Sequence, residues 1–214
     1  MSADGIIDNN SVTVIGRVVS ECTFSHEVYG EGFYNFKVSA DRLSNNNDIL
    51  PITISERLIN KDLLVPGTGI KITGQLRSYN NYTDKRNRLI LTIFAREAEL
   101  FYDEVPPGNP NTIQLNGFIC KPPVYRVTPF GREIADILLA VNRAYNKSDY
   151  IPCIAWGRNA RFVGKLGVGD NIKLWGRIQS REYQKKTEES TEKKIAYEVS
   201  ISRIEIIQKH ITED

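Results

Sequence analysis

Residues 148–163, SDYIPCIAWGRNARFV, contain the change of pattern from which the fold can be predicted. From Tyr150 to Trp156 the residues are mostly apolar, β-branched or aromatic, which is typical of a strand. Residues 157–166, GRNARFVGKL, are then long enough for two helical turns before a glycine-containing stop. Because side chains two positions apart share one face of a strand, Tyr150 and Trp156 point the same way. The stretch predicts a strand with two aromatics on one face, followed directly by a short helix.

The same pattern occurs a second time, 101 residues earlier in the chain. The shift of 101 aligns Gly16 with Gly117, Gly30 with Gly131, Arg42 with Arg143, Asn45 with Asn146, Asp48 with Asp149, Pro51 with Pro152 and Arg57 with Arg158. After one inserted residue, a shift of 102 aligns Gly67 with Gly169, Ile70 with Ile172, Lys71 with Lys173, Gly74 with Gly176 and Ser78 with Ser180. An offset that stays this steady over about 65 residues indicates a tandem duplication of one fold.

Each copy contains five strand-like runs bounded by Gly, Asn, Asp and Pro clusters. They are residues 11–20, 33–40, 49–55, 70–78 and 89–95 in the first copy, and 112–120, 134–143, 150–156, 171–180 and 195–206 in the second. A short helical run follows the third strand in both copies, at residues 56–64 and 157–166. This is the order of an OB-fold, a five-stranded Greek-key barrel. A two-sheet sandwich is the alternative, but it would usually need about seven strands per domain.

The sequence therefore predicts an all-β chain of two tandem OB-folds. The predicted divisions are a first, divergent OB-fold at 1–104, a Pro/Gly/Asn-rich linker at 105–111, a second OB-fold at 112–209 and a short tail at 210–214.

Composition excludes several other classes of protein. The chain is 41% apolar and 25% charged, as globular proteins are. No apolar run approaches the roughly 18 residues of a membrane span, and the N-terminus has no signal-peptide pattern, so we expect a cytoplasmic protein without membrane association. The three cysteines and two histidines lack metal-ligand spacing, which predicts no metal and no cofactor. Since P-loop, HExxH and Ser-His-Asp patterns are missing, we expect no enzymatic activity.

Charge is distributed unevenly between the two halves. Residues 1–107 have a net charge of −3, and residues 108–214 have a net charge of +5. The second half is therefore the candidate for binding an anionic partner. On charge alone, a solvated basic surface explains the difference equally well.

Residues 113–206 resemble the bacterial single-stranded DNA-binding protein (SSB) family. The resemblance lies in IQLNGFICKPPVYRVTPFGREIADILLAVNR (113–143), DYIPCIAWGRNAR (149–161) and LGVGDNIKLWGRIQSREY (166–183), which follow one another in the family's order. The first copy resembles the family more weakly and is assigned through the repeat. The resemblance implies a bacterial or phage protein of DNA replication, repair or recombination that binds single-stranded DNA largely without sequence preference. It also implies that bases stack on Tyr145, Tyr150, Trp156 and Tyr183.

The residues by themselves support such an interface. In residues 171–183 the apolar Ile172, Leu174 and Ile178 belong to the barrel interior, so the alternate positions face outward. The outward positions interleave cations with aromatics, as single-strand binding requires. Trp175 has three open roles: stacking on a base, packing against the other copy, or contacting another subunit. The predicted phosphate contacts are Arg126, Arg132, Arg143, Lys147, Arg158, Arg161, Lys173, Arg177 and Arg181.

The first copy lacks most of these side chains. Ser44, Ile49 and Ser55 stand where the second copy has Tyr145, Tyr150 and Trp156. The secondary candidates in the first copy are Arg77, Tyr79 and Tyr82, with Tyr29, Phe33 and Tyr34 in reserve should it use another face. We therefore expect an unequal pair in which the second OB-fold supplies most of the affinity.

The resemblance also bears on assembly. Family members bring four OB-folds together, which implies a homodimer for a chain that holds two. The sequence ends at IIQKHITED, so we expect the family's acidic partner-recruiting tip to be absent. The competing function is a protein–protein scaffold or accessory factor in a replication or recombination complex. RNA binding is a lesser alternative, because stacking and phosphate pairing do not distinguish the sugars.

Overall fold

The computed structural model of the protein describes residues 9–42, 46–81, 88–186 and 191–210, with the backbone alone for 81, 88, 183–186 and 191–194. The first copy comprises β1 (Asn10–Val18), β2 (Thr23–Val28), β3 (Glu31–Asp41), β4 (Asn47–Ser55), the 3₁₀ turn η1 (Lys61–Leu63), β5 (Gly69–Asn81) and β6 (Arg88–Phe101). The second comprises β7 (Asn111–Ile119), β8 (Val124–Val127), β9 (Glu133–Asn142), β10 (Ser148–Trp156), α1 (Arg158–Val163), β11 (Asn171–Lys186) and β12 (Thr191–Gln208).

Both copies close into barrels in the same way. In the first, β3 pairs with β1 as well as β4, and β4 pairs in parallel with β6. In the second, β9 pairs with β7, and β10 pairs in parallel with β12. The prediction of an all-β chain with two OB-folds is confirmed. The repeated glycines Gly74 and Gly176 lie at bulges where a Cβ would come 2.2 Å from the carbonyl oxygens of Phe94 and Ser200.

Two features of the fold differ from the sequence-based expectation. Each copy has an extra edge strand, β2 or β8, and all residues of these strands are exposed. Because neither face is buried, these strands lack the apolar alternation by which a strand is recognised. The helix predicted at 56–64 is reduced to the single turn η1, whose start is capped by the Asn60 side chain accepting from the Asp62 N–H.

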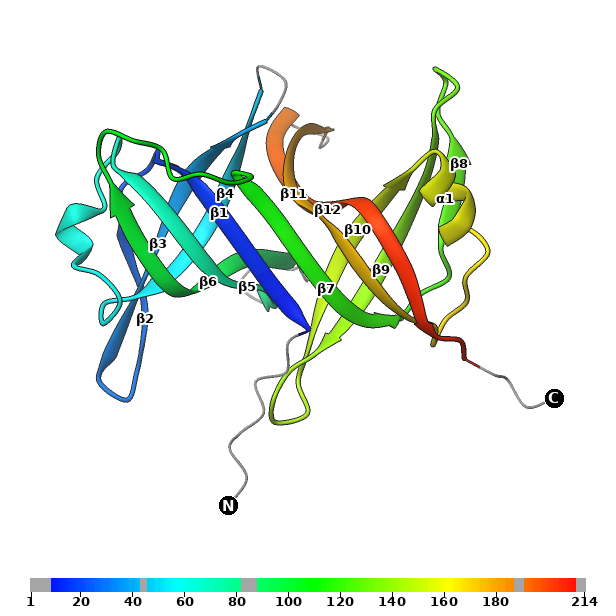
Figure 1. Ribbon diagram of the computed structural model, residues 1–214, viewed down its shortest axis with the longest axis horizontal. Coiled ribbons are helices and arrows are strands. Elements are labelled where there is room, and N and C mark those ends of the chain that lie inside the picture. Colours follow the sequence, from blue (N-terminus) through cyan, green and yellow to red (C-terminus); the bar gives the residue numbers. More distant parts are fainter. Residues whose placement is uncertain (1–8, 43–45, 82–87, 187–190, 211–214) are drawn as a thin grey trace.

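The two copies join edge to edge at the centre of one continuous sheet (Figure 1). Strand β1 pairs with β7 in antiparallel register, and Val12 lies opposite Ile113, which is its own counterpart in the repeat. The strand order, β2-β3-β4-β6-β5-β1-β7-β11-β12-β10-β9-β8, is the same from either end when copies are exchanged. An approximate two-fold axis therefore relates the copies and passes through this central pair.

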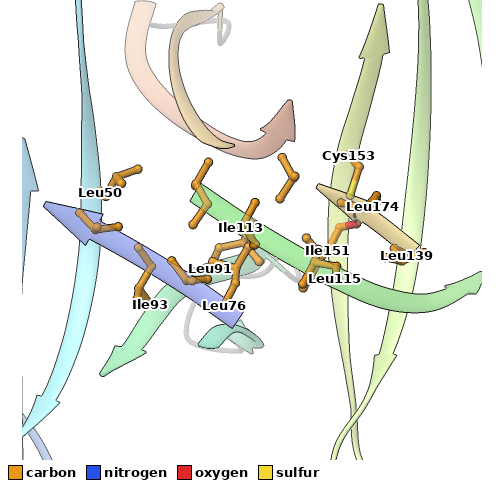
Figure 2. Packing of buried hydrophobic residues seen from close by; sticks show 14 of the residues in the cluster. Leu50, Leu76, Leu91, Ile93, Ile113, Leu115, Leu139, Ile151, Cys153 and Leu174 are labelled. Atoms are coloured by element: carbon orange, nitrogen blue, oxygen red, sulfur yellow. Dashed lines mark hydrogen bonds between the residues drawn. The ribbon is translucent and has the colours of Figure 1, made fainter. Parts of the chain in front are cut away.

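The hydrophobic core crosses the boundary between the copies. One cluster contains Val12, Leu76 and Ile93 of the first copy together with Ile113 and Leu174 of the second. Figure 2 shows Leu76 and Leu91 beside Ile113 at the joint, with Leu115 and Ile151 further into the second barrel. The copies thus share buried apolar surface as well as backbone hydrogen bonds. Among the described residues, no helix is long and apolar enough to cross a membrane.

Candidate nucleic-acid interface

Strand β10 presents two aromatic side chains on its outer face. Tyr150 is 46% exposed and Trp156 is 40% exposed, while Ile151, Cys153 and Ala155 are buried in the barrel. The alternation follows from the pleat, since neighbouring side chains on a strand point to opposite faces. The two rings therefore lie on one face of the second barrel, as their spacing indicates.

Tyr145 lies at the turn between β9 and β10 and is 93% exposed. Its φ is +60°, and that of Asn146 is +53°. This left-handed backbone is uncommon for residues other than glycine, so the turn holds the tyrosine ring outward at a conformational cost. Tyr183 lies in β11 opposite Lys194, but its side chain is outside the described residues, and Tyr82 lies wholly outside them.

Trp175 is held by neighbours in its own copy. Its indole Nε1 donates to Gln114 Oε1 at 3.0 Å. The Lys173 Nζ lies 5.2 Å from the ring centroid, and the Arg203 Cζ lies 4.7 Å from it. Cations over an aromatic face are attracted to its negative potential. These three contacts all lie within the second copy, so they give no sign that Trp175 packs against the first copy.

Several of the predicted phosphate contacts face carboxylates instead. Arg126 Nη2 lies 2.6 Å from Asp136, and Arg161 Nε lies 3.0 Å from Glu133. Both arginines are more than half exposed, so these pairs are weak and can open to a phosphate. The predicted contacts that are exposed and form no ion pair within the described part of the chain are Arg132, Lys147, Arg158 and Arg181.

Arg177 takes part in a buried cluster between the copies. The Asp48 side chain is 1% exposed, and its Oδ2 lies 2.7 Å from Arg177 Nη1 of the other copy. Asp48 also accepts hydrogen bonds from Arg42 and, at 2.9 Å, from the Ser180 N–H. Arg177 therefore neutralises a buried carboxylate, a contact that the sequence alone does not reveal.

The corresponding cluster around Asp149, the repeat equivalent of Asp48, contains Arg143 and Arg77. The buried Asp149 Oδ1 accepts the Ser78 N–H at 2.7 Å. Its Oδ2 lies 3.5 Å from Arg143 Nε and 3.6 Å from Arg77 Nη1, and it has no hydrogen-bond partner among the described residues. Burial raises the pKa of Asp149 despite these favourable neighbours. The sequence signal for the two clusters is the repetition of their members, since the repeat aligns Arg42 with Arg143, Asp48 with Asp149 and Ser78 with Ser180.

The outer face of the first copy carries a different set of aromatics. The His26 and Phe33 rings stack at 4.9 Å, and Phe33 lies 5.6 Å from Phe94, with Arg77 over the far ring at 5.9 Å. Tyr79 is 49% exposed and lines a hollow of about 430 Å³. Of the reserve residues, Tyr34 packs against the core and Tyr29 lies fully exposed at a turn.

The described residues contain no group of three or more His, Cys, Asp or Glu side chains that could hold a metal ion.

Comparison with known proteins identifies the second copy by sequence. Residues 110–207 match the model of the single-strand binding protein family. "Single-stranded DNA-binding protein 1" of Staphylococcus aureus (strain COL) is 37% identical over 81 residues, which are 35% of this chain and 48% of that protein. The chain thus spans about half the length of the curated relatives that it matches.

Comparison of structures extends the likeness to both copies. The wild-type single-stranded DNA binding protein from Thermus aquaticus superimposes with a TM-score of 0.72 at 18% identity, covering 96% of each chain. The dimeric N-terminal domain of the PriB protein from Thermoanaerobacter tencongensis is 49% identical, covers 44% of this chain and 98% of that one, and has a TM-score of 0.39. Through residues 110–207, this chain belongs to the single-strand binding protein family.

Proposed function

We propose that this chain binds single-stranded DNA, largely without sequence preference, and acts in DNA replication, repair or recombination. The observation that carries the proposal is the pair Tyr150 and Trp156, exposed on one face of β10 in the copy whose sequence matches the family. Relatives matched over this region are named single-stranded DNA-binding proteins. Two aromatic rings exposed on one face of a strand provide the kind of platform on which single-stranded nucleic acids stack their bases.

Stacking on these rings supplies the affinity for bases. Each stacked base contributes about 1 to 3 kcal/mol, and because every base has a π face the contribution is tolerant of sequence. Tyr145 adds a third ring at the end of β9, and Tyr183 is the fourth stacking residue of the proposal. A duplex cannot use these rings, since its bases are stacked on each other.

Cations beside the rings pair with the phosphates. Arg132, Lys147, Arg158 and Arg181 are available for this role without breaking an ion pair in the described structure. When DNA binds, Arg126 gives up its ion pair with Asp136, and Arg161 its ion pair with Glu133, to pair with phosphates. Binding then weakens as salt rises, because each neutralised phosphate releases condensed counterions.

The two copies contribute unequally to this proposed activity. Ser55 and Ile49 occupy the positions of Trp156 and Tyr150 in the first copy. The first copy therefore offers no stacking pair on strand β4, and the second copy supplies most of the affinity.

We also propose that two chains associate, which brings four OB-folds together. Light scattering on the purified protein measures this directly. The expected mass is twice that of the 24.3 kDa chain, and a mass of one chain contradicts the dimer.

Fluorescence anisotropy with labelled oligo-dT tests the DNA-binding proposal. Trp156→Ala should weaken binding about tenfold or more, which corresponds to the loss of one stacked base. Tyr102→Ala, which removes an exposed ring after β6, is the matched control and should bind as the wild type does. Equal affinity of the two variants contradicts stacking on Trp156. No binding of the wild type at low salt favours the scaffold function instead.

A further inference from the structure

The hollow beside Tyr79 has walls suited to a flat ring with polar edges. Its apolar walls include Pro51 and Ile90. The Asn35 Oδ1 accepts from the Thr53 hydroxyl at 2.8 Å and the buried Thr92 hydroxyl pairs with the same Thr53 hydroxyl at 2.8 Å, so the group of this wall that can donate to a base is the Asn35 amide nitrogen. Lys37 and Glu21 contribute one charge of each sign. The volume of about 430 Å³ is within the range of small-molecule sites and exceeds what a single base needs.

A second hollow, of about 410 Å³, adjoins the first at the boundary between the copies. It shares Pro51, Ile90 and Leu91 with the hollow beside Tyr79, so the two hollows are adjacent, and together they are called the junction groove. Pro152 and Ala196 complete the walls of the junction groove from the second copy.

The approximate two-fold axis explains the composition of this boundary. Pro51 and Pro152 are equivalent in the repeat. Ile90 pairs with Tyr79 in the β5–β6 ladder, as Ala196 pairs with Arg181 in the β11–β12 ladder. The outer faces of both barrels therefore approach the axis from opposite sides and meet in the junction groove.

The groove borders the proposed stacking face of the second copy at Pro152. Pro152 lies on β10 between Tyr150 and Trp156, and side chains at these even positions share the outer face. A single-stranded DNA that extends beyond the Tyr150 and Trp156 rings would thus contact Pro152, then Pro51 and Ile90, and then the Tyr79 ring.

The side chains that the first copy contributes to the junction groove suit a DNA base better than the equivalent side chains of the second copy do. Asn35 and Thr92 stand at the positions of Asp136 and Glu198 in the repeat and the strand ladders. Tyr79 stands at the position of Arg181. Two carboxylates near the path are therefore replaced by neutral side chains, and a cation is replaced by a ring that can stack on a base.

We propose that a single strand bound at the second copy continues through the junction groove, where Tyr79 stacks on one of its bases. This inference rests on the proposed function and adds to it a path and a further binding residue. It predicts that the first copy contributes only when the strand is long enough to reach it, which is compatible with a second copy that supplies most of the affinity.

Oligonucleotides of two lengths test this path. One OB-fold occupies about 4 to 16 nucleotides, so oligo-dT of about 8 nucleotides reaches the second copy alone and oligo-dT of about 30 spans both. Tyr79→Ala should weaken binding of the long oligonucleotide about tenfold and leave the short one unchanged. Ile90→Glu, which places a negative charge in the groove, should act in the same direction. Tyr102→Ala is the control, since it removes an exposed tyrosine of the same copy that does not line the groove.

The outcomes separate this inference from the proposed function. If Tyr79→Ala and Ile90→Glu bind both lengths as Tyr102→Ala does, the path is wrong although DNA binding stands. If the wild type binds neither length at low salt, the proposed function itself is wrong. Tyr79 is half exposed and its removal should not unfold the protein, so this variant decides the outcome even where Ile90→Glu fails to fold.

Discussion

Asp48 and Asp149, equivalent residues of the two copies, each accept a backbone hydrogen bond from the other copy. Asp48 Oδ1 accepts the Ser180 N–H at 2.9 Å, and Asp149 Oδ1 accepts the Ser78 N–H at 2.7 Å. The serine hydroxyls return the contact, since Ser180 Oγ accepts the Ile49 N–H and Ser78 Oγ accepts the Tyr150 N–H. These reciprocal bonds, with the β1–β7 ladder, fix the orientation in which both outer faces meet.

The Asp48 cluster should contribute strongly to stability. Asp48→Ala leaves the partly exposed Arg42 and Arg177 without their shared carboxylate and the Ser180 N–H without its acceptor, which should cost about 1 to 3 kcal/mol. Urea unfolding followed by circular dichroism measures the change in free energy of unfolding. Asp41→Ala, which removes a neighbouring exposed carboxylate, should change it by less than about 0.5 kcal/mol. Similar losses in both variants contradict the role given to Asp48.

The Asp149 carboxyl should make stability depend on pH in the opposite sense to most carboxylates. Its pKa is raised in the folded protein, mainly by burial. It therefore favours folding below its unfolded pKa of about 3.9, and this contribution is lost as the pH rises through the folded value.

Asp149→Asn, which does not titrate, provides the comparison. The wild type's free energy of unfolding, relative to that of the variant, should fall as the pH rises above about 3.9, the unfolded pKa of the carboxyl. Urea unfolding of both proteins at each pH measures the difference. A difference that rises with pH contradicts a raised pKa.

Trp175 should not act as a stacking residue. Lys173 and Arg203 lie over its ring and Gln114 holds its indole N–H, so a base would have to displace these groups. Trp175→Phe should therefore leave the Kd for oligo-dT within about twofold of the wild type, which is less than one stacking contact. A loss as large as that of Trp156→Ala in the same anisotropy assay would return Trp175 to the interface.

Cations that face solvent and cations that pair with a buried carboxylate should differ in their effect on salt dependence. Lys147→Ala removes one phosphate contact, so the slope of log K against log salt should decrease in magnitude by about 0.7. Arg177→Ala should lower the free energy of unfolding and leave this slope unchanged, because Arg177 faces Asp48. Titrations at several salt concentrations distinguish the two cases, and identical slopes for Lys147→Ala and the wild type remove Lys147 from the interface.

Much of this fold could be predicted because the repeat gave two independent samples of each pattern. The alternation around Ile172 and Leu174 and the run from Tyr150 to Trp156 indicated barrel strands, as the structure confirms. Strands β2 and β8 were not predictable from periodicity, since they bury neither face. Arg143 and Arg177 were assigned to phosphate because a sequence does not show which carboxylate a cation meets, and their partners lie on other strands.

The part of the candidate interface that lies on a single strand could be predicted from the sequence. Tyr150 and Trp156 share a face by the geometry of β10 alone. The junction groove, in contrast, is lined by residues of β2, β3, β4, β5, β6, β10 and β12, which only the arrangement of both barrels brings together. The two copies meet at this groove because β1 pairs with β7. No local sequence pattern predicts that pairing.

Quenching of tryptophan fluorescence in the Trp175→Phe variant tests the central claim most directly, because Trp156 is then the only tryptophan in the chain. The variant is titrated with oligo-dT and with duplex DNA at about 50 mM and about 200 mM salt, a range over which counterion release changes affinity strongly. We predict saturable quenching by oligo-dT that weakens at the higher salt and is not reproduced by the duplex. Binding of oligo-dT without any change in Trp156 emission, or no binding at the lower salt, would contradict base stacking on the second OB-fold.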